Sequence, residues 1–218
     1  GKSGTLVVLN PGKEPERIMV DSYGSLPVFD ANASSYFYLS NGQLLRNGQW
    51  APEQIGSALT GRTLFWTGSD MGFGFYRAGG LQVAFVFGTK SRGLNDSVPI
   101  PQIRGQLVDS TAVFGKDRCW FFTATQESGK IVHRVYLIRS SGTIEATAEA
   151  EANDGSWLGT IRGKCASGNF LLAATDDGLK RLEAINGQIV VAREFPDTEP
   201  FVDSASNLFA GSDGLYVV

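Results

Sequence analysis

Short apolar runs of five to nine residues alternate with turn-forming residues along the whole chain. "SYFYLS", "LQVAFVFG" and "IVHRVYLIRS" are examples of the runs, and "NGQ", "ESGK" and "SSG" are examples of the separators. Runs of this length, bounded by glycine, asparagine, aspartate and serine, are typical of β-strands joined by tight turns. The best helical candidate, "IEATAEAEAND", alternates glutamate and alanine as a strand does. The pattern predicts an all-β chain with many hairpins.

A tripeptide marker indicates that these strands repeat. Val-Asp-Ser occurs at 20–22, 108–110 and 202–204, and each copy closes an apolar stretch and precedes a short uncharged strand. Two further strands match these without the marker. The turns after the five strands average about 44 residues apart around a closed ring, which is the size of a four-stranded β-propeller blade. The five turn positions are Asp30, Ser69, Lys116, Thr175 and Ser212.

We therefore expect a single domain, residues 1–218, folded as a five-bladed β-propeller of four-stranded antiparallel blades. The last blade would be shared by the two ends of the chain, with residues 5–9 pairing antiparallel with 214–218 and the termini close together. Such closure removes a free sheet edge. The longest interval leaves room for an insertion, "NDGSWLGTIRGKCASG". The expected strands are 25–29, 35–40, 43–46 and 50–55; 63–68, 73–78, 81–88 and 100–108; 111–115, 119–126, 131–139 and 142–150; 169–174, 178–183, 188–195 and 199–202; and 207–211, 214–218, 5–9 and 16–20.

Residues 169–195, "NFLLAATDDGLKRLEAINGQIVVAREF", resemble the repeat of quinoprotein-like propellers in the wider WD-like group. They share its order of inner strand, Asp-Gly turn, strand, Asn-Gly turn and strand. "NLFAGSDGLYVV" followed by "GKSGTLVVLN" has the same shape. The resemblance implies a propeller, and such propellers also occur as accessory domains of bacterial multi-domain proteins. The tryptophan-docking pattern of the quinoproteins is absent here, so we expect no quinone.

Residues that catalysis would need are scarce. His133 is the only histidine, and it shares a strand face with Val135 and Leu137, which favours a position at the border of the core. The chain contains no G-x-S-x-G, Walker A or G-x-G-x-x-G motif. A glycosidase needs two carboxylates about 5–10 Å apart, yet the expected inner strands contain no aspartate or glutamate. We expect no enzyme activity, no catalytic residue, no metal site and no cofactor.

Five residues are candidates for binding at the loops of one face. Asp21, Asp109 and Asp203, from the three Val-Asp-Ser copies, would lie in loops between blades and could form a partial acidic ring that binds a cation or a basic partner. Alternatively, each Asp-Ser pair forms a sharp bend by bonding its own backbone. Trp50 and Trp157 lie near turns, where an indole could stack on a sugar, whereas Trp66 and Trp120 fall inside apolar strands and are expected in the core.

The charge and hydrophobicity of the chain limit the classes of partner it can bind, and its two cysteines allow at most one disulfide. The net charge of −3 and the scattered basic residues give no attraction for nucleic acid or an anionic membrane. No apolar run reaches the ~18 residues of a membrane span, so we expect a soluble protein; its compartment stays undetermined. Cys119 and Cys165 could pair, but two free thiols are the simpler expectation.

We interpret the chain as a non-catalytic interaction module, tethered to other domains, that binds a protein partner. A propeller lectin is the alternative, and a glycoside hydrolase is less favoured.

Overall fold

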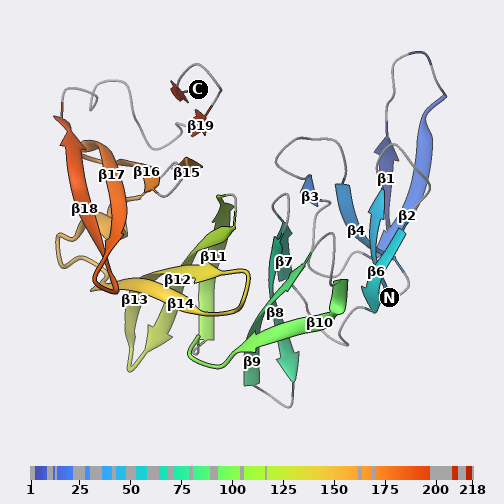
Figure 1. Ribbon diagram of the computed structural model, residues 1–218, viewed down its shortest axis with the longest axis horizontal. Coiled ribbons are helices and arrows are strands. Elements are labelled where there is room, and N and C mark those ends of the chain that lie inside the picture. The colour runs from blue at the N-terminus through green and yellow to red at the C-terminus, as the bar shows by residue number, and fades with distance from the viewer. Residues whose placement is uncertain are drawn as a thin grey trace. The chain divides into compact units, whose positions relative to one another are not determined.

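The computed structural model divides the chain into two compact units, residues 1–104 and 105–218, and each is described by itself (Figure 1). Strands dominate both units, which confirms the predicted all-β class. The structure describes residues 3–8, 12, 14–21, 28–29, 36–40, 43–47, 53–57, 64–67, 71–78, 81–88, 93–103, 106–115, 117–161, 164–167, 170–196, 208–210 and 215–217.

Unit 1 contains a hairpin and two four-stranded antiparallel sheets among its described residues. In the hairpin, β1 (Ser3–Val8) pairs with β2 (Glu16–Asp21). Each four-stranded sheet follows chain order and is therefore a meander. The strands expected for the first two blades are found, except that the last one ends at Ile100, where the prediction placed its start. The strands are β3 (Val28–Phe29), β4 (Tyr36–Ser40), β5 (Gln43–Asn47), β6 (Glu53–Ser57), β7 (Leu64–Thr67), β8 (Met71–Ala78), β9 (Leu81–Gly88) and β10 (Gly93–Ile100).

A glycine explains the close packing in the second of these sheets. Gly74 on β8 lies directly opposite Phe85 on β9, and the Phe85 ring is buried over it. A Cβ atom at position 74 would lie 2.3 Å from Cζ of Phe85, so any larger residue would collide with the ring. The alternation of glycine and aromatic residues in "MGFGFY" thus makes room for an aromatic ring across the strand.

Unit 2 contains an eight-stranded sheet made of two four-stranded antiparallel meanders, the first formed by strands within residues 106–151 and the second by strands within residues 164–195. The two meanders meet where β14 (Ile144–Glu151) and β18 (Gln188–Phe195) form one parallel bridge, Thr147 to Gln188. A separate hairpin joins β19 and β20. The strands are β11 (Gln106–Phe114), β12 (Arg118–Glu127), β13 (Lys130–Arg139), β14 (Ile144–Glu151), β15 (Lys164–Ser167), β16 (Phe170–Thr175), β17 (Gly178–Ile185), β18 (Gln188–Phe195), β19 (Leu208–Ala210) and β20 (Leu215–Val217).

The second meander starts one strand earlier than the sequence predicted. Its first strand, β15, falls inside the segment expected to be an insertion, and the predicted strand 169–174 is its second strand, β16. The four residues of β15, "KCAS", are too few to produce an alternating signal, which explains the error. The predicted strand at 199–202 lies outside the described residues.

The predicted closing blade is not among the described strand pairs. β1 pairs with β2 and β19 pairs with β20, in two separate two-stranded sheets. The hairpins expected at the two ends of the chain are therefore present. The pairing of 5–9 with 214–218, the five-blade count and the single domain stay predictions.

The core of unit 2 lies between the two meanders. Alternate residues of β12 and β13, including Trp120, Phe122 and Val135, face Leu171 and Leu182 of the second meander. Burying one such side chain contributes about 1.5–3 kcal/mol. Trp120 is fully buried, which confirms its predicted core position. This core holds the two meanders at a fixed separation, and the candidate site lies at one end of it.

Candidate binding site around the 3-10 helix

The connection between β14 and β15 carries a short 3-10 helix, η1 (Trp157–Thr160). The preceding residues "NDGS" form a tight turn in which Asn153 and Gly155 both have positive φ. Asp154 Oδ1 accepts a hydrogen bond from the Ser156 N–H at 2.8 Å. Ser156 Oγ then accepts from the Leu158 N–H at 3.3 Å and caps the helix. The turn-forming residues of this segment therefore fix where η1 begins.

Leu158 anchors η1 to the protein. Its side chain is 5 % exposed and belongs to the core cluster between the two meanders. Trp157, beside it, is partly buried and packs against the same cluster. Because one helix residue is fixed in the core, the polar residues around it are held in place on the surface. Two pockets flank η1.

The His133 pocket lies between η1 and strands β11, β12, β13 and β15, with a volume of about 180 Å³. Lys164 is one of its walls, with Nζ placed 4.9 Å from the centre of the Phe122 ring. His133 is partly buried, on the strand face of Val135 and Leu137, which confirms its predicted place at the core border. Cross-strand pairing sets Asp109, Ala124 and His133 in one row.

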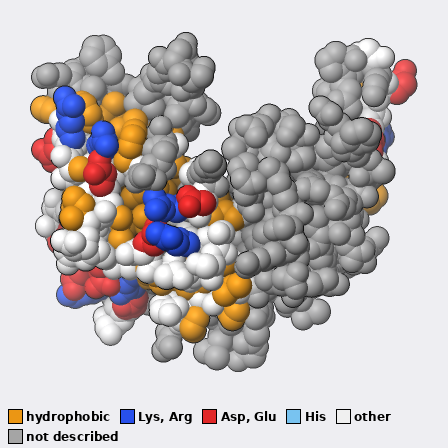
Figure 2. Space-filling model, in the orientation of Figure 1, with side chains coloured by type: hydrophobic (Ala, Val, Ile, Leu, Met, Phe, Trp, Pro, Cys, Tyr) orange, Lys and Arg blue, Asp and Glu red, His pale blue; other side chains and the backbone are white. Residues whose placement is uncertain are grey.

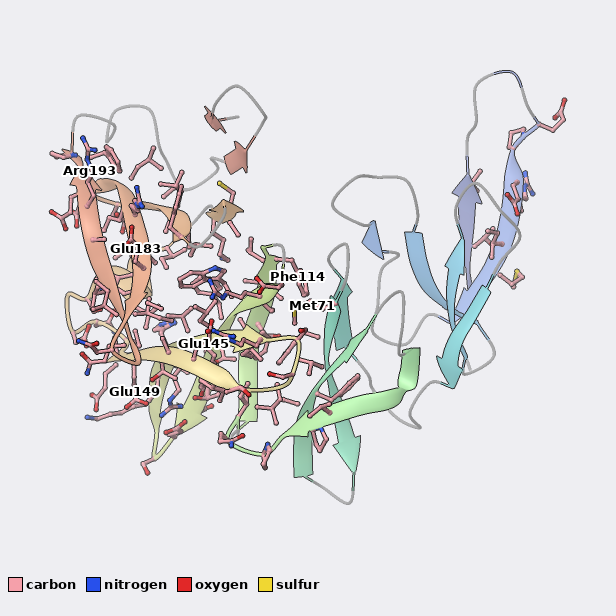
Figure 3. All side chains as sticks on the ribbon, in the orientation of Figure 1. Met71, Phe114, Glu145, Glu149, Glu183 and Arg193 are labelled. Atoms are coloured by element: carbon pink, nitrogen blue, oxygen red, sulfur yellow. The ribbon has the colours of Figure 1, made fainter. Side chains whose placement is uncertain are left out.

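The Trp157 pocket lies between η1, β14 and β18, with a volume of about 410 Å³. Trp157, Leu158 and Ile189 supply its apolar walls, and Ser156 and Gln188 supply polar groups. It opens beside the single bridge between β14 and β18, where the two strands stop pairing. Glu149 of β14, labelled in Figure 3, also borders it. An indole beside polar groups suits a ligand with both apolar and polar surface.

A third pocket, of about 520 Å³, is lined by charged residues that already pair with one another. Glu145 binds Arg118 at 2.8 Å and also pairs with Arg139. Arg181 pairs with Glu183 at 2.5 Å, and its guanidinium lies 4.2 Å from the centre of the Phe170 ring. Figure 2 shows basic and acidic side chains beside one another on the visible face of unit 2. Such internal pairing favours a structural role for this pocket.

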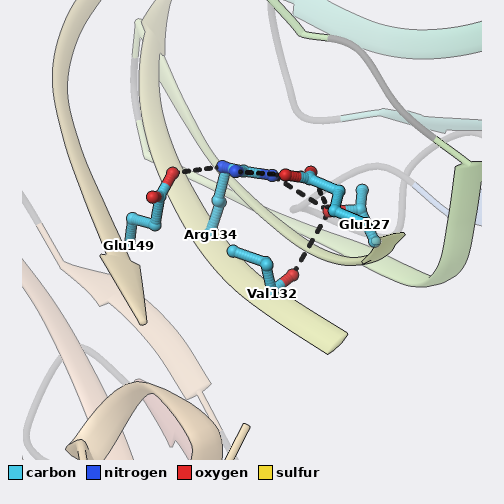
Figure 4. A network of polar contacts seen from close by, with 5 residues as sticks. Glu127, Val132, Arg134 and Glu149 are labelled. Carbon is cyan, nitrogen blue, oxygen red and sulfur yellow. Dashed lines mark hydrogen bonds and ion pairs between the residues drawn. The ribbon is translucent and has the colours of Figure 1, made fainter. Parts of the chain in front are cut away.

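Arg134 is the centre of a polar network (Figure 4). The network lies on the face of the first meander opposite the one that carries the core residues Val135 and Leu137. Its Nε donates to Glu149 at 2.5 Å, and its terminal nitrogens donate to both carboxylate oxygens of Glu127. Thr125 Oγ1 donates to Glu127 at 2.8 Å. The bonds from Arg134, and then that from Thr125, lower the pKa of Glu127 to about 2. The network ties β12, β13 and β14 together.

Of the predicted binding residues, Trp157 lies in η1 and borders a pocket, and its role in binding stays a prediction. Asp21 is the last residue of β2, at a strand end as its marker predicted. Asp109 lies within β11, so its predicted position in a loop between blades is wrong; the strand continues through Val-Asp-Ser, and a register shift between Leu107 and Asp109 absorbs the bend. Asp203 and Trp50 lie outside the described residues. The acidic ring therefore stays a prediction.

Sequence reasoning missed the polar residues beside Trp157. Glu149 sits in an alternating strand, and Gln188 follows an Asn-Gly turn, so each has an ordinary local explanation. They approach one another because β14 bridges to β18, 41 positions away along the chain at Thr147 and Gln188. No local pattern signals such a contact.

A metal ion needs several ligating side chains around one point. Within the described residues, no three His, Cys, Asp or Glu side chains gather closely enough to hold one. Cys119 and Cys165 are free and buried, as the simpler expectation had it. Burial raises the pKa of both thiols, which keeps them protonated at neutral pH. The described part of the chain has no helix long and apolar enough to cross a membrane.

Comparison with known proteins identifies no family. No family model matches the sequence, and neither does any curated protein. Among solved structures, TolB from Acinetobacter baumannii matches with 15 % identity and a TM-score of 0.41, covering 85 % of this chain and 61 % of TolB. Two structures of Hsv2 from Kluyveromyces lactis, one with a complete loop 6CD, match with 12 % identity and a TM-score of 0.36. They cover 88 % and 87 % of this chain and 69 % of Hsv2 in each case. The chain thus spans about three fifths of TolB, and likenesses this distant carry no argument about function.

Proposed function

We propose that the chain is a five-bladed β-propeller that serves as a non-catalytic interaction module. Four antiparallel four-stranded meanders support the propeller, because each has the composition of one blade. The two terminal hairpins supply the four strands that a fifth blade needs. In this proposal residues 1–218 form one domain, tethered to other domains of a larger protein.

Closure of the ring is tested by nuclear magnetic resonance on the whole chain. Contacts between backbone protons of residues 5–9 and 214–218, in an antiparallel pattern, are expected. If β1 and β20 show such contacts only within their own hairpins, the five-blade proposal fails.

The observation that carries the interaction function is the anchored helix η1 between two pockets. A loop held by a buried leucine presents surface groups without a large ordering cost, which favours binding. Charged side chains on the neighbouring strands β12, β13 and β14 are already paired with one another, as in the Arg134 network. That pairing favours a binding role over proton transfer, so we assign no catalytic residue and no cofactor.

Selection of random peptides displayed on phage, with the whole chain as the target, tests this proposal. We expect enriched peptides that lose affinity for Lys164→Ala, in the His133 pocket, or for Gln188→Ala, in the Trp157 pocket. The same peptides should still bind Ile185→Ala, a matched surface variant at an exposed position outside both pockets. Failure to enrich any peptide, or equal binding to all three variants, would refute the proposed role.

A carbohydrate-binding function is the second candidate. The Trp157 pocket favours it, because an indole and polar side chains converge there as they do where proteins bind sugars. Binding to a glycan array that is lost in Trp157→Ala would replace the protein partner with a sugar. Turnover of a generic glycoside substrate would instead support the hydrolase alternative.

A further inference from the structure

The outer edge of β14 is open beyond its bridge to β18. The backbone N–H of Ala152 donates to the carbonyl of Ile131 on β13 at 2.8 Å, so the N–H and C=O groups of the even-numbered residues of β14 point toward β13. The N–H of Thr147 points away from β13 and donates to the carbonyl of Gly187 at 3.1 Å. Alternation makes Glu149 the next residue whose N–H and C=O point outward. No described strand pairs with β14 at that position.

This open edge faces a cavity with an aromatic wall. Glu149 borders the Trp157 pocket together with Ser156, Trp157 and Gln188. An extended segment that bonds to the Glu149 backbone would place alternate side chains on the two faces of the sheet. One of these faces is the face of Trp157, since Ala148 and Trp157 pack against the same core cluster.

The charges at this end of the sheet are mainly negative. Arg134 is shared by two carboxylates, and Lys130 pairs with Glu151 at 2.7 Å. The Glu149 side chain is 61 % exposed, so it can meet a further cation. Carboxylates outnumber cations among the described charged residues here, which are Glu127, Lys130, Arg134, Glu149, Glu151 and Asp154. A partner of positive charge is therefore attracted to the edge.

We propose that the Trp157 pocket binds an extended, basic segment of a protein partner, which adds to β14 as a further strand at Glu149. The inference rests on the proposed interaction function and specifies the partner's chemistry. Main-chain hydrogen bonds to Glu149 supply affinity that does not depend on the partner's sequence. Arginine or lysine at alternate positions supplies selectivity, by approaching the indole of Trp157 or the carboxylates at this end of the sheet.

The test uses the whole chain and peptides selected from a random phage library, remade in soluble, fluorescent form. Glu149→Pro removes the outward N–H, and Glu149→Ala keeps it while removing the carboxylate, so the two variants form a matched pair. We expect basic selected peptides, affinity lowered about tenfold or more by proline, and affinity lowered about two- to threefold by alanine. Affinity should also fall as salt is added.

A second measurement does not depend on the folding of the proline variant. Methylation of successive backbone nitrogens of the bound peptide should weaken binding to the unaltered chain at every other position only. Three outcomes would overturn the inference and leave an interaction function intact. The selected peptides could be acidic or uncharged, the Pro and Ala variants could bind them with equal affinity, or methylation of the peptide could leave its affinity unchanged. Enrichment of no peptide would refute the proposed function itself. Dimerisation of the unaltered chain that Glu149→Pro abolishes would assign the edge to a second copy and overturn the inference.

Discussion

Replacing Leu158 with alanine removes the buried end of the side chain that fixes η1. Leu158 is 5 % exposed and packs in the cluster that joins the two meanders of unit 2. Buried Leu→Ala substitutions cost about 2–5 kcal/mol, and the cost falls when neighbouring groups can fill the space. Leu158 lies on a short helix between two pockets of about 180 and 410 Å³. We therefore expect a loss near the lower limit, about 2–3 kcal/mol.

Urea denaturation followed by tryptophan fluorescence measures this loss. Ile185→Ala is the matched control, because Ile185 is 48 % exposed and its truncation should change the free energy of unfolding by less than about 0.5 kcal/mol. Leu158→Ala should also lower the affinity for any selected peptide, measured at temperatures where the variant is fully folded. If Leu158→Ala costs no more than Ile185→Ala, then Leu158 does not anchor η1 and the site has lost its physical basis.

Three further substitutions test other parts of the structure. The pKa of Glu127 is held at about 2, below its ordinary value of 4.5, so its carboxylate stabilises the fold above pH 4.5 and this contribution is lost as the pH falls toward 2. Glu127 is 40 % exposed, so screening reduces the effect to about 1 kcal/mol, and acid titration of Glu127→Gln should show a flatter stability curve between these pH values. Gly74→Ala should cost about 1–3 kcal/mol in urea denaturation because the new methyl group collides with Phe85, and an unchanged midpoint would contradict that packing. Ala150→Pro should cost about 3 kcal/mol or more, since the N–H of Ala150 points toward β13; a thermal melt like that of the unaltered chain would show that the strand register is wrong.

The strands of the first meander of unit 2 could be read closely from the sequence. "CWFFTATQ" and "IVHRVYLIRS" predicted strands at 119–126 and 131–139, and the structure has β12 and β13 there with limits that differ by one residue. Strong alternation defines these strands. Ser128 and Gly129, both at positive φ, form the tight turn between them. Side-chain alternation and turn conformation, both local properties of the sequence, determine this part of the fold.

Features that depend on distant parts of the chain were missed or misplaced. β15 is too short to show a period, and β11 continues through the Val-Asp-Ser marker because its partner β12 extends alongside it. Trp157 was proposed as a binding residue from the sequence because it lies near turn-forming residues. Glu149 became a candidate only through the bridge between β14 and β18, a contact between two meanders that no local pattern encodes.

Hydrogen–deuterium exchange of the whole chain, with and without a selected peptide, tests the central claim most directly. The claim is that the chain binds a partner segment at η1 and the adjoining edge of β14. We predict that the peptide slows exchange of the Glu149 amide and of residues 152–160. Slowed exchange confined to the turn at 140–143, at the opposite end of β14, would contradict the claim, and so would no change with the peptide bound.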